Sequence, residues 1–245
     1  MGKQRAVMAG VMLLVVLLAS TGALGAEAGR PPQRSFFEMA WDATWSTWIG
    51  FFDIFAIFGL SLTAVALIIE HGITIRRVVL LPELSVAQVK TMFDERRFRE
   101  ALEFCQADPS FVSGVVHAGL VEAANGYEAM ERAMQDAAEE RTSRLYRKIE
   151  YLNLIGNVSP MLGLFGTVYG MMVAFAKIET LRSPDASELA GGILTALFST
   201  FAGLFVAIPA LSAYAIYRNR IEQLSMEAAL VAEELLANFK PTAAA

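Results

Sequence analysis

Four of the hydroxyl side chains in two apolar stretches of the chain could line an ion path, and both stretches are long enough to cross a membrane. They are Thr167 in the first stretch and Thr195, Ser199 and Thr200 in the second. Hydroxyl groups both donate and accept hydrogen bonds, and hard cations prefer oxygen ligands. The pattern therefore indicates an ion path lined by these four residues. The competing interpretation is that small residues only pack the helices together.

The two stretches contain 26 residues without a formal charge (151–176) and 29 such residues (189–217). Each exceeds the roughly 20 residues that a helix needs to cross a bilayer core. On a helical projection the small residues of each stretch gather on one face and the bulky residues on the other. Small faces let membrane helices approach closely. The predicted helix-packing residues are Gly156, Gly163, Gly166, Gly170, Gly192 and Gly203.

Each stretch also contains one proline, Pro160 in the first and Pro209 in the second. Proline removes a backbone donor and tends to kink a helix, a defect that membrane helices tolerate where neighbours satisfy the freed carbonyl. We predict a kink at both positions. The kinks either shape the ends of a pore or bend the helices for packing.

Two segments carry a resemblance to a known family. They are Ser159-Pro-Met-Leu-Gly-Leu-Phe-Gly-Thr-Val-Tyr-Gly-Met-Met and Gly192-Ile-Leu-Thr-Ala-Leu-Phe-Ser-Thr-Phe-Ala-Gly-Leu-Phe-Val-Ala-Ile-Pro-Ala. Both resemble the signature helices of the MotA/TolQ/ExbB proton channel family, in particular its ExbB and TolQ branches. The resemblance covers both helices in register.

The resemblance implies a multi-pass protein of the bacterial inner membrane that forms a homo-oligomer, typically a pentamer. It implies an ExbD- or TolR-like partner that supplies a membrane aspartate, and a TonB- or TolA-like protein on which ion flow does work. The family's ion-path threonines correspond to Thr167 and Thr200. ExbB and TolQ carry a glutamate in the last helix, and this chain has Thr195 at that position. Residues 151–176 and 189–217 contain no carboxylate, so the charged ligand of a transported ion is expected from the partner. The transported ion is either H⁺ or Na⁺.

Composition agrees with a membrane protein: 55% of residues are hydrophobic, 18% are charged, and the mean hydropathy is +0.46. The net charge of −5 argues against a nucleic-acid binder. The single cysteine, Cys105, is predicted to be a buried small hydrophobe. The sequence has no metal cluster, no catalytic constellation and no cofactor motif, so we predict that the protein is not an enzyme.

The N-terminal part is predicted to contain a signal peptide (1–28), then a periplasmic linker with an interfacial aromatic helix (29–48), then the first membrane span (49–71). Only 16 residues (54–69) separate Asp53 from Glu70, and they cover about 24 Å as a helix, less than the hydrocarbon core. We therefore expect Asp53 near the outer interface, as a solvated end cap rather than an ion-path ligand.

The rest of the chain completes an all-α membrane protein with three transmembrane helices and a helical cytoplasmic insert (72–150). The insert is rich in Lys and Arg, which the positive-inside rule places in the cytoplasm. Within it, Ser85 to Gln88 resembles a capping box, and a helix from Phe98 should stop at Asp108-Pro109. No Gly or Pro occurs from Tyr127 to Ile155, which predicts one long helix that extends from the cytoplasm into the second span. The remaining segments are predicted as follows: second span 151–176, periplasmic hairpin 177–188, third span 189–217 and cytoplasmic C-terminal helix 218–245.

Two functions of different classes fit these features. The first is an ion-conducting subunit of an energy-transducing motor, and the second is a non-conducting oligomeric membrane scaffold. A scaffold needs small residues but not hydroxyls, so Thr167, Thr195, Ser199 and Thr200 favour the first. The sequence leaves open the transported cargo, the driven partner and the stoichiometry.

Overall fold

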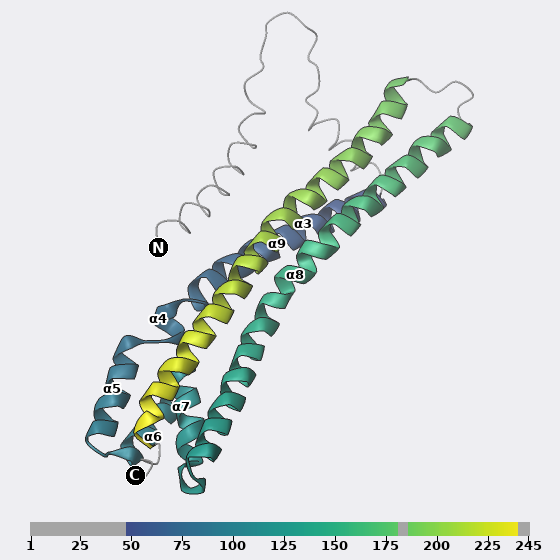
Figure 1. Ribbon diagram of the computed structural model, residues 1–245. Coiled ribbons are helices and arrows are strands. Elements are labelled where there is room, and N and C mark those ends of the chain that lie inside the picture. Colours follow the sequence, from purple (N-terminus) through teal and green to yellow (C-terminus); the bar gives the residue numbers. More distant parts are fainter. Residues whose placement is uncertain (1–47, 181–185, 240–245) are drawn as a thin grey trace, which may run out of the picture. The chain divides into compact units, whose positions relative to one another are not determined.

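The computed structural model describes residues 48–180 and 186–239, and all regular structure in these two ranges is helical (Figure 1). Three of the helices are long and apolar enough to span a membrane, over Gly50–Thr74, Tyr127–Ala176 and Gly192–Leu236. The predicted all-α architecture with three membrane-spanning helices is therefore confirmed. The predicted signal peptide (1–28) and nearly all of the predicted linker and interfacial helix (29–48) lie outside the described residues. The helices are α3 (Trp48–Thr74), α4 (Arg77–Leu80), α5 (Glu83–Asp94), α6 (Phe98–Ala107), α7 (Phe111–Val121), α8 (Tyr127–Thr180) and α9 (Ala186–Leu236), with 3₁₀ turns at Ala123–Asn125 and Ala237–Phe239.

Two of the helices are unusually long, α8 with 54 residues and α9 with 51. The single helix predicted from Tyr127 into the second span is confirmed. Both helices continue through their internal prolines, Pro160 and Pro209. The predicted hairpin of 177–188 includes the end of α8, the start of α9 and residues 181–185, which lie outside the described residues.

The chain divides into two compact units. The first unit comprises Met1–Gly59 and Ser159–Pro209, and the second comprises Leu60–Val158 and Ala210–Ala245. Helices α3, α8 and α9 contribute residues to both. On α8 and α9 the boundaries fall at Ser159 and Pro209, so each internal proline lies at a unit boundary.

The second unit has a helical core in which α6 packs against α5 and α7. Its fully buried side chains include Val89, Val112 and Val116, and each such side chain is worth roughly 1.5–3 kcal/mol of transfer free energy. Cys105 is 2% exposed, and burial raises the pKa of its thiol to about 12, which confirms the predicted buried small hydrophobe. The C-terminal part of α9 contributes an apolar face, with Ile221, Leu224, Ala228 and Leu235 buried.

The predicted capping box at Ser85 is wrong. Helix α5 begins at Glu83, with Pro82 rather than Ser85 as its N-cap residue and no side-chain cap. The fixed φ of proline already suits this position, and the Glu83 carboxylate in the first turn is favoured by the helix dipole. The Ser85 hydroxyl instead contributes, together with Ser110 and Ser113, to lowering the pKa of the Asp108 carboxyl. The predicted stop of the next helix is confirmed, because α6 ends at Ala107 with Asp108 as its C-cap residue.

Asp108 organises the start of α7 through three serines. Its Oδ2 accepts hydrogen bonds from Ser113 Oγ at 2.6 Å and Ser110 Oγ at 2.9 Å. Ser110 is the N-cap residue, and its hydroxyl accepts from Ser113 N at 3.3 Å. Burial opposes the charge on Asp108, but the hydrogen bonds from Ser113, Ser110 and Ser85 outweigh it and hold the pKa of the carboxyl below its usual value.

We expect Asp108→Ala to destabilise the protein by about 1.5–3 kcal/mol near neutral pH, the range for hydrogen bonds to a charged group. Because the folded pKa lies below the unfolded value, this contribution is complete above about pH 4 and is lost as the pH falls through the folded pKa. Thermal unfolding of wild type and variant in detergent at about pH 7 and about pH 3 measures it. The exposed Glu103→Gln on α6 is the control. An unfolding difference that is equally large at both pH values would contradict the assignment.

Candidate functional site

The first unit contains a buried carboxylate where three helices meet. Asp53 of α3 is 6% exposed and Ser199 of α9 is 3% exposed, and Ser199 Oγ donates a hydrogen bond to Asp53 Oδ2. The third helix, α8, contributes Gly166, and a Cβ added there would collide with both Ser199 Oγ and Asp53 Oδ2. Glycine at this position therefore leaves the space that the pair occupies.

The other oxygen of this carboxylate, Asp53 Oδ1, is buried and has no hydrogen-bond partner in the part of the chain that the structure describes. An ionised carboxylate offers about four acceptor positions, and leaving such a group unsatisfied in an apolar environment is costly. Buried polar atoms without a partner are uncommon and call for an explanation. Asp53 is therefore the residue of the first unit whose environment points most directly to a role beyond packing.

The expectation that Asp53 is a solvated end cap is wrong. Asp53 is 6% exposed and, within α3, faces the small residues Gly166 and Ser199 rather than solvent. The missed signal is helical spacing, because Asp53 stands 4 and 11 residues before Ile57 and Ala64, which are both buried.

The hydroxyl residues named from the sequence have different surroundings. Ser199 contacts the Asp53 carboxylate, whereas Thr200 Oγ1 donates to the Gly163 carbonyl of α8 at 3.1 Å. Thr167 Oγ1 donates to the Leu164 carbonyl of its own helix at 2.6 Å. Thr195 lies within α9, but its side chain is outside the described residues. The structure thus brings Ser199 to the carboxylate and connects Thr200 to the backbone of α8.

Glycines bring α8 and α9 to backbone distance in the first unit. An added Cβ at Gly163 would lie 2.9 Å from Ser199 O, and one at Gly203 would lie 2.5 Å from Ser159 O. Further along the same pair of helices, an added Cβ at Gly170 would lie 3.0 Å from Ala196 Cβ, and one at Gly192 would lie 2.9 Å from Ala174 Cβ. In the second unit a Cβ at Gly156 would lie 2.5 Å from Leu211 Cγ. Real Cβ atoms hardly ever approach other atoms this closely, so larger residues at these positions would push the helices apart.

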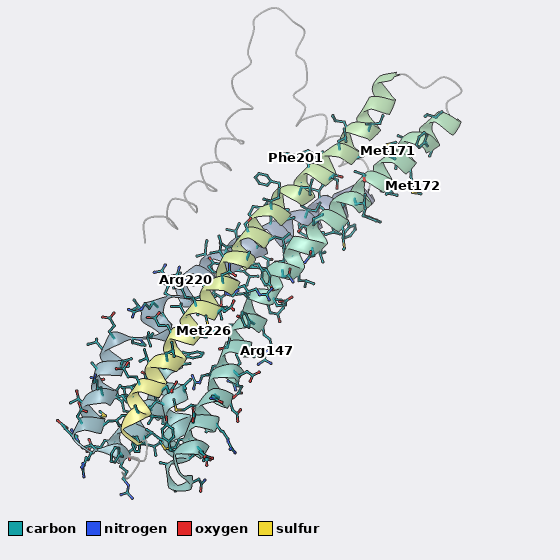
Figure 2. All side chains as sticks on the ribbon, viewed as in Figure 1. Arg147, Met171, Met172, Phe201, Arg220 and Met226 are labelled. Atoms are coloured by element: carbon teal, nitrogen blue, oxygen red, sulfur yellow. The ribbon has the colours of Figure 1, made fainter. Side chains whose placement is uncertain are left out.

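The bulky faces of the same helices are exposed (Figure 2). Large apolar side chains on a surface of this kind suit a membrane or a neighbouring subunit. Figure 2 labels Met171 and Met172 of α8 and Phe201 of α9 among them. The exposed members are Met161, Leu164, Phe165, Val168, Met171, Met172 and Phe175 on α8 and Leu197, Phe201, Leu204 and Ile208 on α9.

The second unit has its own buried polar cluster. His71 of α3 is 3% exposed, its Nε2 lies 3.2 Å from the Lys148 carbonyl of α8, and its ring packs edge-on against Tyr217 of α9. Tyr217 in turn donates to the Ile68 carbonyl at 2.7 Å. These bonds satisfy the polar groups and connect the three helices. The described residues contain no group of His, Cys, Asp and Glu side chains that could hold a metal ion.

Residues 106–229, just over half of the 245-residue chain, match the MotA/TolQ/ExbB proton channel family. The Tol-Pal system protein TolQ of Pseudomonas aeruginosa is 39% identical over 97 residues, which cover 40% of this chain and 42% of that protein. The biopolymer transport protein ExbB of Xanthomonas campestris pv. campestris is 35% identical over 96 residues, covering 39% of this chain and 38% of that protein. The chain thus spans about two fifths of the length of the curated relatives it matches.

Among solved structures, that of C. jejuni MotAB is similar over 96% of this chain and 95% of that chain, with 20% sequence identity and a TM-score of 0.43. This likeness is too distant to bear on the site.

Proposed function

This chain belongs to the MotA/TolQ/ExbB proton channel family, and we propose that it is an ion-conducting subunit of an inner-membrane motor that couples ion flow to mechanical work. The protein is a membrane protein with three membrane-spanning helices. The proposal goes further in assigning conduction to the hydroxyl-bearing faces of α8 and α9 and to the carboxylate that they enclose.

The observation that carries this proposal is the buried pair of Asp53 and Ser199. An ionisable residue inside a membrane helix is expensive to keep and marks an ion or proton pathway in most proteins that have one. Packing of α3, α8 and α9 would be better served by an alanine at position 53, because close approach needs small residues and not charge. A non-conducting scaffold gives no reason for the carboxylate.

The proposed assembly follows the relatives, one of which is named a Tol-Pal system protein and another a biopolymer transport protein. We propose a homo-oligomer, a pentamer by family resemblance, that surrounds an ExbD- or TolR-like subunit with a membrane aspartate. A TonB- or TolA-like protein would receive the work. The basic residues of 72–150 support a cytoplasmic location for that segment under the positive-inside rule.

Alanine substitutions at the hydroxyls test the proposal. We expect Thr200→Ala to abolish ion flux through the reconstituted complex, because it removes the hydroxyl that connects α9 to the Gly163 carbonyl at the level of the site. Thr167→Ala should also lower flux, and Thr200→Ser, which keeps the hydroxyl, is the matched control. Oligomer formation, measured by size-exclusion chromatography with light scattering, should be unchanged in all three.

Normal flux in both alanine variants would refute the ion-path assignment. Loss of assembly together with flux in Thr200→Ala, but not in Thr200→Ser, would assign the hydroxyl to packing and support the scaffold function.

A further inference from the structure

Asp53 Oδ1, which has no hydrogen-bond partner among the described residues, indicates which ion the site binds. Asp53 Oδ2 accepts the one hydrogen bond that the Ser199 hydroxyl can donate. Asp53 Oδ1 is buried without a hydrogen bond among the described residues. Burying a neutral carboxyl group in this position costs far less free energy than burying a carboxylate, which needs hydrogen bonds or a counter-ion. A proton on Oδ1 would leave the bond from Ser199 to Oδ2 unchanged.

The membrane-spanning parts of α8 and α9 in the first unit carry no charged side chain that would hold Asp53 in its ionised form. Residues 159–176 of α8 and 192–209 of α9 contain no Asp, Glu, Lys, Arg or His, and their single titratable side chain is Tyr169. No salt bridge joins Asp53 to a described residue. Within the described part of the first unit, the carboxyl therefore has a hydroxyl as its polar neighbour and no counter-ion.

The oxygen atoms at the site also suit a proton better than a sodium ion. Hard cations in proteins are held by about six or more oxygens, a rule stated for calcium and magnesium that we extend to sodium. Here Ser199 Oγ is the side-chain oxygen that the described residues bring into hydrogen-bond contact with the Asp53 carboxyl. The hydroxyls of Thr200 and Thr167 are both engaged with backbone carbonyls, of Gly163 and Leu164.

We propose that Asp53 is a proton-binding group of this chain, with Oδ1 as the atom that takes up the proton and Ser199 as the hydrogen-bond partner that holds the carboxyl in place. The exchange is balanced, since Asp53 carboxylate and H⁺ give the carboxylic acid and no other reactant takes part. This inference rests on the proposed ion conduction and deepens it by naming H⁺ as the ion. It also places an acidic group in this chain rather than only in its partner.

Labelling with dicyclohexylcarbodiimide tests the proposal in the full complex. The reagent reacts with a protonated carboxyl in an apolar site: the acid proton moves to a reagent nitrogen, the carboxyl oxygen adds to the central carbon, and rearrangement gives a stable adduct with no leaving group. We expect peptide mass spectrometry to find Asp53 modified, with less modification as the pH rises and no change when potassium is replaced by sodium. Asp53→Asn removes the label at this position. Glu70→Gln, an exposed carboxylate-to-amide change on the same helix, leaves it intact.

Protection of Asp53 by sodium at constant pH would overturn the proton assignment in favour of a cation site. Absence of the adduct at every pH would show that the carboxyl is not protonated in the complex, which overturns the proposal as well.

Proton flux of the reconstituted complex separates this inference from the function on which it rests. Flux that falls to the level of empty liposomes in Asp53→Asn, and stays normal in Glu70→Gln, supports both. Wild-type flux that persists in Asp53→Asn would refute the proton-binding role while conduction stands. Ser199→Ala gives a second variant, expected to lower flux and to change the pH at which half of Asp53 is labelled. A wild-type complex without flux, but with pH-dependent labelling of Asp53, would refute conduction and leave proton binding intact.

Discussion

Replacement of Gly166 with alanine is expected to abolish ion flux, the largest functional effect of a single methyl group in this protein. The added Cβ would occupy the position of Ser199 Oγ and collide with Asp53 Oδ2. Both side chains are short, and both atoms are buried between α3, α8 and α9, so neither can swing away without breaking their hydrogen bond. Proton flux of reconstituted complexes measures the effect.

The matched control is Gly59→Ala on α3. An added Cβ at Gly59 would have no heavy atom within 4 Å, so the variant changes glycine to alanine in a membrane helix without touching the site. Its flux should equal that of wild type. Equal flux in Gly166→Ala would contradict the role of the Asp53 and Ser199 pair.

The second large effect is expected at Gly203, where alanine should destabilise the helix packing of the first unit. Its Cβ would lie 2.5 Å from Ser159 O and 3.2 Å from Gly163 Cα. Both atoms belong to the backbone, so rotation of a side chain cannot relieve the overlap and α8 and α9 must separate. Overpacking of this kind costs about 1–3 kcal/mol or more, and a polar carbonyl without its normal neighbours adds to the cost.

Thermal unfolding in detergent and the yield of oligomer measure the effect of Gly203→Ala, again with Gly59→Ala as the control. We expect a lower melting temperature and less oligomer for Gly203→Ala only. A melting temperature equal to that of wild type would show that α8 and α9 are not in backbone contact at this level. Gly166→Ala and Gly203→Ala thus separate a loss of the site from a loss of packing.

The helices could be predicted from the sequence because their signals are local. The two long charge-free stretches mark the membrane-spanning parts of α8 and α9, and the stretch without Gly or Pro from Tyr127 marks α8 as one continuous helix. The stop before Pro109 and the buried face that includes Ile221 follow from similar patterns. In each case residues within one or two turns of each other determine the outcome.

The pairing of Asp53 with Ser199 could not be predicted in the same way. These residues are 146 positions apart in the sequence, and no periodicity within either helix indicates which face of α3 packs against α9. The length of α3 suggested that Asp53 reaches water, but the absence of a side chain at Gly166 makes room for it inside. The capping prediction at Ser85 failed for a different reason, because α5 begins at Glu83 directly after Pro82 and Ser85 lies inside the helix.

The most direct test of conduction is the ion flux of the wild-type complex, reconstituted in liposomes with its single-span partner. Flux is measured once under a proton gradient without sodium and once under a sodium gradient without a proton gradient. The proposed function and the proton-binding role of Asp53 predict flux under the proton gradient alone. A correctly assembled complex that passes neither ion would contradict the proposed function.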